Sequence, residues 1–467
     1  MENKLTKKYG LITAICMVVG IVVGSGIFFK GQKILAATNG NVWLSVLAWA
    51  IGGIVMVICA SQFAVMATKY SKVNGVVDYA EETCGSRYAY YVGWFATTIY
   101  YPAMTSVLAW VSAQYFGVLF GWGETTAEVM ILAGFFLVMS YVVNALSPKI
   151  AGYFQVTTTV IKLIPLVLMG IVGIIAGLIN APDGNVGILI QNFIGDADSK
   201  SAGMSELFAG VCATAFAYEG WIIATSINSE IKDSKKNLPL ALLLGALIVV
   251  IIYILYNVAI CGGAPMNELM DSNLGAPHAF KNIFGTVGGT ILNVCIVISC
   301  LGTLNGLMLG STRGLYSISA RGEGPLPKMF SQVDEQTNMP TNSAIFGLFV
   351  CAAWLVFWYG GVVSPLMAEK DCWFGIFSFD SSELPIITIY AMYIPMIIVW
   401  IIKEKDLGVF KRFVLPILSI IACLFLVFVA AWTHRISALF YLIVYVVIMA
   451  IGFLFSKDFK NIISKKK

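Results

Sequence analysis

Residues 22–31 read VVGSGIFFKG and interrupt an apolar stretch that is long enough to cross a membrane. The stretch covers residues 11–37, and about 20 apolar residues in an α-helix span a hydrocarbon core of roughly 30 Å. Its middle contains Gly24, Ser25 and Gly26, three weak helix formers in succession. We therefore predict a membrane helix that is broken near its middle.

The composition of the chain indicates an integral membrane protein. Of its 467 residues, 59% are hydrophobic and only 12% are charged, and the mean hydropathy is +0.85. Such a chain has too little polar surface to cover a soluble globule of this length. Apolar stretches of about 18 residues or more recur throughout, in place of the short alternating segments of a membrane β-barrel. The predicted fold class is an all-α integral membrane protein.

Twelve stretches qualify as transmembrane helices. They cover residues 11–37, 42–67, 88–120, 126–146, 152–179, 204–230, 238–263, 280–317, 341–361, 384–402, 413–433 and 436–455. We treat residues 1–455 as a single transmembrane domain, with helices 1–5 at 11–179, helices 6–10 at 204–402 and helices 11–12 at 413–455, followed by a short basic cytoplasmic tail at 456–467. The third and eighth stretches are longer than one crossing, so they tilt or extend beyond the bilayer.

The distribution of Lys and Arg predicts that both termini are cytoplasmic. With the N-terminus inside, 22 of the 29 Lys and Arg residues lie in inner segments, six lie in outer segments, and Lys162 lies within a span. This bias follows the positive-inside rule. The first stretch has no signal-peptide cleavage pattern after it and is interpreted as a retained helix. We expect a multi-pass protein in the lipid bilayer of the cell membrane, here a bacterial inner membrane.

Several other classes of protein find little support. The net charge of +4 comes from basic residues spread over short inner loops, so no nucleic-acid partner is predicted. The ten cysteines lack CxxC spacing, and His278 and His434 are the only histidines, which gives little basis for a metal site, a disulfide or a catalytic triad. A nucleotide-binding GxxxxGK[ST] loop is absent as well. We predict no enzyme activity, no cofactor and no metal.

The sixth stretch contains a second interruption. Residues 208–231 read FAGVCATAFAYEGWIIATSINSEI, with the acid Glu219 and the helix breaker Gly220 in the middle. An acid at the bilayer centre costs roughly 2.5–3.5 kcal/mol on an insertion scale and is normally kept for function. The two broken stretches are five spans apart. That spacing is typical of an inverted repeat of five helices whose first members are interrupted at a midplane site.

Broken helices expose backbone groups that can bind both ends of an α-amino acid. The free N–H groups and the positive dipole end of a half-helix attract a carboxylate, and the carbonyls before a break accept hydrogen bonds from an ammonium group. The alternative is that the small residues serve only close helix packing. The predicted substrate-binding residues are Val22, Ser25, Gly26, Ile27, Phe216, Ala217 and Glu219.

Three segments carry a resemblance to a known family. They are VVGSGIFFKG at 22–31, FAYEGWIIATSINSEIKDSKKNLPLAL at 216–242 and SARGEGPLPKMFSQVDEQTNMPTNSAIFG at 319–347. They resemble marker segments of the amino acid–polyamine–organocation superfamily, and within it the bacterial relatives of the L-amino-acid transporter family. The resemblance implies a five-plus-five inverted repeat, the LeuT-like fold, with helices 1 and 6 interrupted and helices 11 and 12 outside the core.

The resemblance also implies roles for single residues in gating. The glycine-rich break of helix 1 corresponds to residues 24–26, and the aromatic gate of helix 6 corresponds to Phe216, whose alternative role is ordinary packing. Glu230 matches an acid of the inner gate, and Arg313 or Arg321 is a candidate partner by location alone.

Two intramembrane charges bear on the substrate and the coupling ion. Relatives often have glycine or aspartate at the position of Glu219, so cationic amino acids or amines become plausible substrates if Glu219 lines the site. Lys162, in TTTVIKLIPLVL, either snorkels to the interface or, as the resemblance implies, places its ammonium where related transporters bind sodium. In the second case the carrier is sodium-independent, and Lys162 could take and release a proton.

The sequence therefore predicts a sodium-independent secondary transporter of small L-amino acids that works by alternating access. Amino-acid exchange (antiport) is the first choice of mode, and proton-coupled symport is the alternative. A non-transporting amino-acid sensor is the candidate from a different class, and the short tails beyond the first and last spans favour the transporter. An intramembrane hydrolase built on Ser25 and Glu219 is a remoter option.

Overall fold

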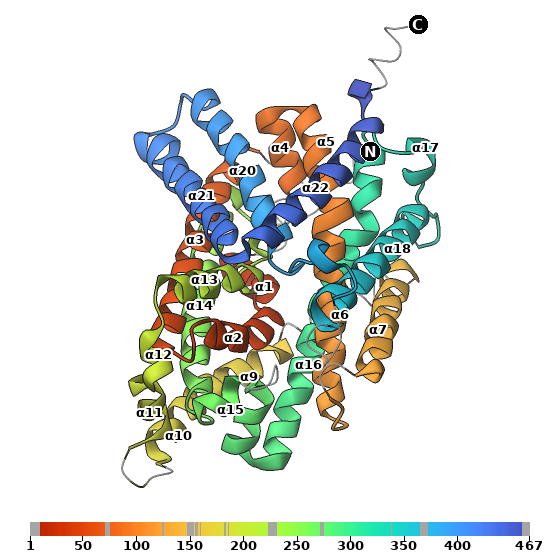
Figure 1. The fold of residues 1–467 in the computed structure, drawn as a ribbon. Coiled ribbons are helices and arrows are strands. Elements are labelled where there is room, and N and C mark those ends of the chain that lie inside the picture. Colours follow the sequence, from red (N-terminus) through yellow and green to blue (C-terminus); the bar gives the residue numbers. More distant parts are fainter. Residues whose placement is uncertain are drawn as a thin grey trace, which may run out of the picture. The chain divides into compact units, whose positions relative to one another are not determined.

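The computed structural model describes most of the chain. The described residues are 10–70, 75–123, 126–146, 154, 157–158, 160–181, 184, 186–222, 231–270, 275–337, 339–364 and 372–459. These residues form helices and turns and contain no β-strand (Figure 1). The all-α prediction is thus confirmed for this part of the chain.

The chain divides into two compact units. The first unit comprises Met1–Tyr79, Thr159–Ser299 and Tyr390–Thr433, and the second comprises Ala80–Thr158, Cys300–Ile389 and His434–Lys467. Each unit therefore combines segments that are far apart in the sequence.

The helices of the first unit include the predicted helices 1, 2, 6 and 7. They are α1 (Leu11–Val22), α2 (Gly26–Ala37), α3 (Val42–Lys69), α9 (Leu163–Leu168), the π-helical turn η2 (Met169–Gly173), α10 (Ile174–Ile179), α11 (Ile188–Ile194), α12 (Ala197–Ser201), α13 (Met204–Ala217), α14 (Ser234–Ile260), α15 (Met266–Met270), the π-helical turn η6 (Phe410–Val414) and α21 (Leu415–His434). Four helices contribute residues to both units, namely α4 (Val76–Cys84), α16 (Gly275–Ser319), α20 (Leu384–Lys403) and α21, whose last residue His434 belongs to the second unit.

The second unit contains the predicted helices 3, 4, 9 and 12. Its helices are α5 (Ser86–Phe95), the π-helical turn η1 (Ala96–Tyr100), α6 (Tyr101–Val118), α7 (Ala127–Leu146), α17 (Pro327–Phe330), α18 (Thr341–Trp358), the π-helical turn η4 (Tyr359–Val363), the 3-10 turn η5 (Gly375–Phe377) and α22 (Ile436–Leu454).

Several helices are suited to crossing a membrane. Within the described residues, eight helices are long and apolar enough, and the bent pair of α1 and α2 makes a ninth if it counts as one span. A multi-pass membrane protein follows from these helices. The count of twelve spans stays a prediction, because the stretch at 152–179 is described only in part and α13 ends well before residue 230.

The eighth stretch contains a break near its start. Within α16, Gly285 has φ +72° and ψ 178°, which is not a helical conformation. Positive φ is readily adopted only by glycine, so this residue allows the chain to kink between the two parts of α16.

Small residues allow the helices of the first unit to pack closely. A Cβ atom on Gly52 of α3 would lie 2.0 Å from Thr214 Oγ1 of α13, and a Cβ atom on Gly245 of α14 would lie 2.7 Å from Val18 of α1. Glycine is therefore needed at both positions for these helices to approach as they do. This packing holds α3 and α14 against the two interrupted helices.

Candidate functional site

The first helix break lies where the sequence predicts it. Helix α1 ends at Val22 and α2 begins at Gly26, and the two helix axes differ in direction by 52°. The Val23 N–H donates to Val19 O at 2.8 Å, which closes α1, and Ser25 O accepts from the N–H of Phe29 at 2.9 Å, which opens α2. Three residues thus separate two half-helices within one apolar stretch.

The second break begins at the end of α13. That helix stops at Ala217, and Gly220 has φ +107°, a conformation that residues with a Cβ atom rarely adopt. The continuation of the predicted sixth span at 223–230, including Glu230, lies outside the described residues. Helix α13 therefore ends close to Gly220, where the sequence predicts the interruption.

The two breaks are in direct contact. A Cβ atom on Gly26 would lie 2.6 Å from Ala217 Cα, and a Cβ atom on Gly220 would lie 3.3 Å from Ile21 O. The backbone of α2 thus begins against the backbone where α13 ends. Residues that the sequence separates by about 190 positions form one site.

Tyr253 of α14 joins the two breaks, and sequence reasoning missed it. Its Oη lies 3.1 Å from Val22 O and 3.1 Å from Ala217 O, the carbonyls at the ends of α1 and α13. A phenol has one proton, so it donates fully to only one of these carbonyls at a time. A buried tyrosine in the middle of an apolar span, one turn before Asn257, is the signal that could have identified it.

Aromatic rings support this tyrosine. The Tyr253 ring stacks on Tyr218 with centroids 5.2 Å apart, and the Trp49 ring lies edge-on to it at 5.4 Å. The Tyr218 hydroxyl donates to Trp49 O at 2.9 Å. The second break is thereby anchored to α3.

Ser25 carries a buried hydroxyl that stays unpaired within the described part of the chain. The residue is 1% exposed, and its Oγ has no hydrogen-bond partner among the described residues. Next to it, the N–H groups of Gly26 and Ile27 open α2 and have no acceptor within that helix. Buried polar groups are normally hydrogen-bonded, so this cluster of donors has the character of a place for a ligand or water.

Phe216 packs beside this cluster in an aromatic pair. Its ring lies edge-on to that of Phe29 on α2, with centroids 5.8 Å apart. The ammonium of the buried Lys30 lies 5.5 Å from the centre of the Phe216 ring. The predicted gate residue is thus held between α13 and α2, close to the first break.

Lys162 points its ammonium at α1. The residue is 2% exposed, and Nζ donates a hydrogen bond to Gly20 O, in the last turn before the break. A snorkelling lysine would instead extend its charge to the surface. The structure therefore places this cation next to the broken helix.

Glu219 interacts with groups on α3 and α20. It is half-buried, and its carboxylate interacts electrostatically with Cys59 on α3 and with Tyr390 and Tyr393 on α20. Cys59 Sγ in turn lies 3.8 Å from Cys423 Sγ of α21. Glu219 thus interacts with groups on α3 and α20, helices that no local sequence pattern connects to it.

The suggested partners of Glu230 belong to the second unit. Arg321 pairs with Glu81, with 3.7 Å between Nε and Oε2, and Arg313 Nη2 lies 3.8 Å from Met339 Sδ. Since Glu230 is outside the described residues, its pairing stays a prediction.

Comparison with known proteins gives consistent results. The family model for amino acid permeases matches residues 9–458. The serine/threonine exchanger SteT of Bacillus subtilis is 29% identical over 89% of this chain and 88% of its own length. The b(0,+)-type amino acid transporter 1 of Mus musculus is 27% identical over 94% of this chain and 87% of its own length. These relatives are amino acid transporters.

Proposed function

This chain belongs to the amino acid permease family, and we propose that it is a sodium-independent exchanger of small neutral L-amino acids. One observation carries the proposal. The hydroxyl of Ser25, unpartnered among the described residues, lies with the N–H groups that open α2, at the point where α2 meets the end of α13. Such a cluster suits a small ligand with a carboxylate.

The carboxylate of the substrate would bind at the start of α2. Ser25 Oγ and the N–H groups of Gly26 and Ile27 supply three donors at the positive end of a helix dipole. Hydrogen bonds to a charged acceptor are each worth about 1.5–3 kcal/mol. A carboxylate can therefore offset the cost of entering a buried site.

The ammonium of the substrate would bind at the carbonyl ends of α1 and α13. Val22 O and Ala217 O both face Tyr253 Oη at 3.1 Å, and its single proton leaves acceptor capacity on each carbonyl. The negative ends of the two helix dipoles add to the attraction. One small volume thus offers complementary groups for both poles of an amino acid.

Phe216 would cover the bound substrate. It immediately precedes Ala217 and packs edge-on against Phe29 of α2, so a change in the position of either half-helix would move the ring. We propose that this ring opens and closes the outer path during alternating access.

Lys162 would take the place of a coupling sodium ion. Its buried ammonium binds Gly20 O beside the break, where it supplies a fixed positive charge to the carbonyl end of α1. The Lys162 ammonium would supply the positive charge that sodium supplies in the related transporters, so we propose that transport needs no sodium. A buried lysine that exchanges its proton is the basis of the alternative mode, proton-coupled symport.

The choice of neutral substrates rests on Glu219 and on the relatives. The interactions of Glu219 with Cys59, Tyr390 and Tyr393 place it with α3 and α20, and the relative SteT is a serine/threonine exchanger. Cationic amino acids remain the alternative, because Glu219 is only half-buried. Substitution of Glu219 by glycine should leave neutral selectivity unchanged.

The test is uptake into proteoliposomes in sodium-free buffer. Radiolabelled L-serine, L-alanine and L-arginine would be supplied outside, with and without unlabelled amino acid inside and with and without a proton gradient. Uptake of L-serine that requires internal amino acid supports exchange. Uptake into empty vesicles that follows the gradient would replace exchange by symport, and binding without uptake in folded protein would favour a sensor.

A further inference from the structure

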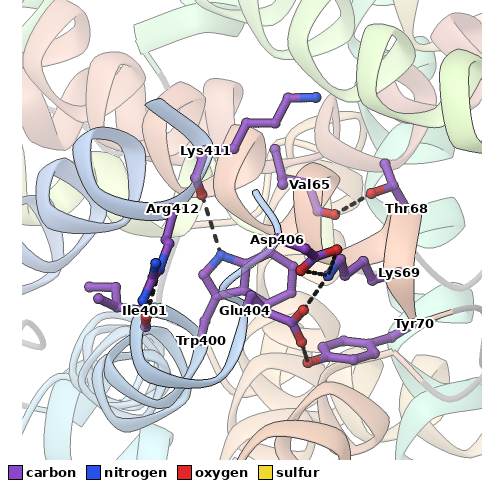
Figure 2. A network of polar contacts seen from close by, with 10 residues as sticks. All are labelled: Val65, Thr68, Lys69, Tyr70, Trp400, Ile401, Glu404, Asp406, Lys411 and Arg412. Carbon is purple, nitrogen blue, oxygen red and sulfur yellow. Dashed lines mark hydrogen bonds and ion pairs between the residues drawn. The ribbon is translucent and has the colours of Figure 1, made fainter. Parts of the chain in front are cut away.

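A charged cluster links the end of α3 to the turn between α20 and η6 (Figure 2). Lys69 Nζ contacts Glu404, and it lies 2.6 Å from Asp406 Oδ1 and 2.9 Å from Asp406 Oδ2. The Tyr70 hydroxyl donates to Glu404 Oε1 at 2.7 Å. Both carboxylates of the turn are therefore neutralised or hydrogen-bonded by α3.

Three cations lie in this turn or in η6, which follows it. Lys405 and Lys411 are exposed and Arg412 is half-exposed. Among the described residues, no carboxylate lies within ion-pair distance of these three side chains. We call residues 405–412, which carry these three cations, the basic turn.

The backbone of the basic turn is held in place by α20. Arg412 Nε donates to Ile401 O at 3.2 Å, and the indole N–H of Trp400 donates to Lys411 O at 3.4 Å (Figure 2). The positions of the cations are thus set by a packed helix and not by a free loop.

Exposed apolar side chains flank these cations. Val409 is 71% exposed and Phe410 is 61% exposed, and both directly precede Lys411 and Arg412. Basic side chains next to exposed apolar ones are typical of segments at a membrane interface, where the apolar groups enter the acyl region and the cations meet phosphates. This pattern fits a phospholipid surface better than a soluble partner.

We propose that the basic turn binds the phosphate headgroups of anionic phospholipids, and that Lys69 makes this possible by neutralising Glu404 and Asp406. Without Lys69, two carboxylates would face the same headgroups and cancel most of the attraction. The site lies at the predicted cytoplasmic end of the spans and is independent of the proposed substrate site.

The first test compares lipids and variants. Purified full-length protein in neutral detergent is titrated with phosphatidylglycerol or with phosphatidylcholine, and the rise in the thermal midpoint is recorded. The wild type should respond to phosphatidylglycerol alone. The triple variant Lys405→Gln, Lys411→Gln, Arg412→Gln should need more of that lipid for half the rise, at roughly fivefold for each basic residue removed.

A matched control separates a local site from general charge. Lys232, Lys235 and Lys236 are also exposed, belong to the same unit and lie at the start of α14. Their triple substitution by glutamine removes the same charge elsewhere and should leave the lipid response unchanged. An equal loss in both triple variants would overturn the proposal, as would an equal response of the wild type to inorganic phosphate.

The role of Lys69 is tested by loss and rescue. Lys69→Gln should reduce the response to phosphatidylglycerol although the basic turn is intact. The triple variant Lys69→Gln, Glu404→Gln, Asp406→Asn lacks the ion pairs as well but carries no excess negative charge, so its lipid response should recover. Failure of this rescue in folded protein would contradict the neutralising role of Lys69.

Discussion

The α1–α2 break and the end of α3 are both clusters of polar groups within the first unit, but they differ in whether these groups have hydrogen-bond or ion-pair partners. At the end of α3, Lys69 and Tyr70 supply partners for both carboxylates of the turn after α20. At the break, Ser25 Oγ has no partner among the described residues, and the first N–H groups of α2 lack intrahelical acceptors. A satisfied cluster stabilises the fold, whereas an unsatisfied buried one favours a ligand that completes it.

The two regions also differ in how their parts are held. The break depends on backbones that approach so closely that Gly26 has no room for a Cβ atom. The end of α3 depends on long side chains that reach a turn more than 300 residues away in the sequence. Substitutions at the break should therefore affect transport, and substitutions at the end of α3 should affect stability.

The largest expected effect is that of Gly26→Val. Its Cβ atom would lie 2.6 Å from Ala217 Cα, and neither backbone can give way without moving a half-helix. Uptake should be abolished, with a loss of about 1–3 kcal/mol in the free energy of unfolding from overpacking. The control Gly31→Ala lies on the same helix and meets nothing within 4 Å, so it should transport normally. Normal uptake by Gly26→Val would show that transport does not need the close approach of the two breaks.

The next largest effect is that of Lys162→Met, which keeps the volume and removes the ammonium. Loss of the charged hydrogen bond to Gly20 O should lower exchange by roughly 10- to 100-fold. The measurement is initial uptake at matched amounts of folded protein. Wild-type rates in sodium-free buffer would contradict the role proposed for this lysine.

Ser25→Ala should raise the KM for substrate by about tenfold, because one donor to the carboxylate is lost. The free energy of unfolding should not fall, since the hydroxyl has no partner to lose within the described residues. Ser45→Ala is the matched control: Asn257 Nδ2 donates to Ser45 Oγ at 3.0 Å, so this change should lower stability and leave KM unaltered. A lower stability of Ser25→Ala together with a raised KM of Ser45→Ala would contradict this prediction.

Lys69→Met should lower stability without changing the KM, whereas Ser25→Ala should raise the KM without lowering stability. Lys69 is 25% exposed, so its ion pairs are partly screened and their loss should cost about 1 kcal/mol of unfolding free energy. The KM for substrate should not change. Thermal unfolding and uptake measured on the same preparation check both statements, and a large change in KM would connect the end of α3 to the substrate site.

The smallest effect is a pH dependence at the end of α3. The hydrogen bond from Lys69 lowers the pKa of Asp406 below its usual value near 3.9. The unfolded chain then binds more protons than the folded one, so this contribution to stability is present above about pH 4 and is lost as the pH falls through the folded pKa. The difference in thermal midpoint between wild type and Lys69→Met should therefore shrink between pH 7 and pH 3, and a difference that grows would contradict this.

Sequence reasoning located the breaks because their signals are local. Glycine, serine and an acid inside apolar stretches are visible without any knowledge of packing, and the structure places Gly26 and Gly220 at helix interruptions. Phe216 lies against Phe29 of α2, and its role as a gate stays a prediction.

Long-range partners could not be predicted in this way. Tyr253 reaches the ends of two helices, and Lys69 reaches a turn after α20, and in a single sequence neither pairing leaves a pattern. The direction of Glu219 depends on the rotation of the chain after α13, which is set by Gly220 and by packing against α3. Likewise, the kink at Gly285 was not recognised, since an isolated glycine in an apolar helix is common.

The most direct test of the account is an experimental structure of the protein with L-serine bound, in neutral lipid and without sodium. The account predicts that the serine carboxylate lies within hydrogen-bond distance of Ser25 Oγ and the N–H groups of Gly26 and Ile27, with its ammonium toward Val22 O and Ala217 O. Serine bound elsewhere, with Ser25 Oγ still unpartnered, would contradict the central claim that the unsatisfied polar groups at the helix break are the substrate site.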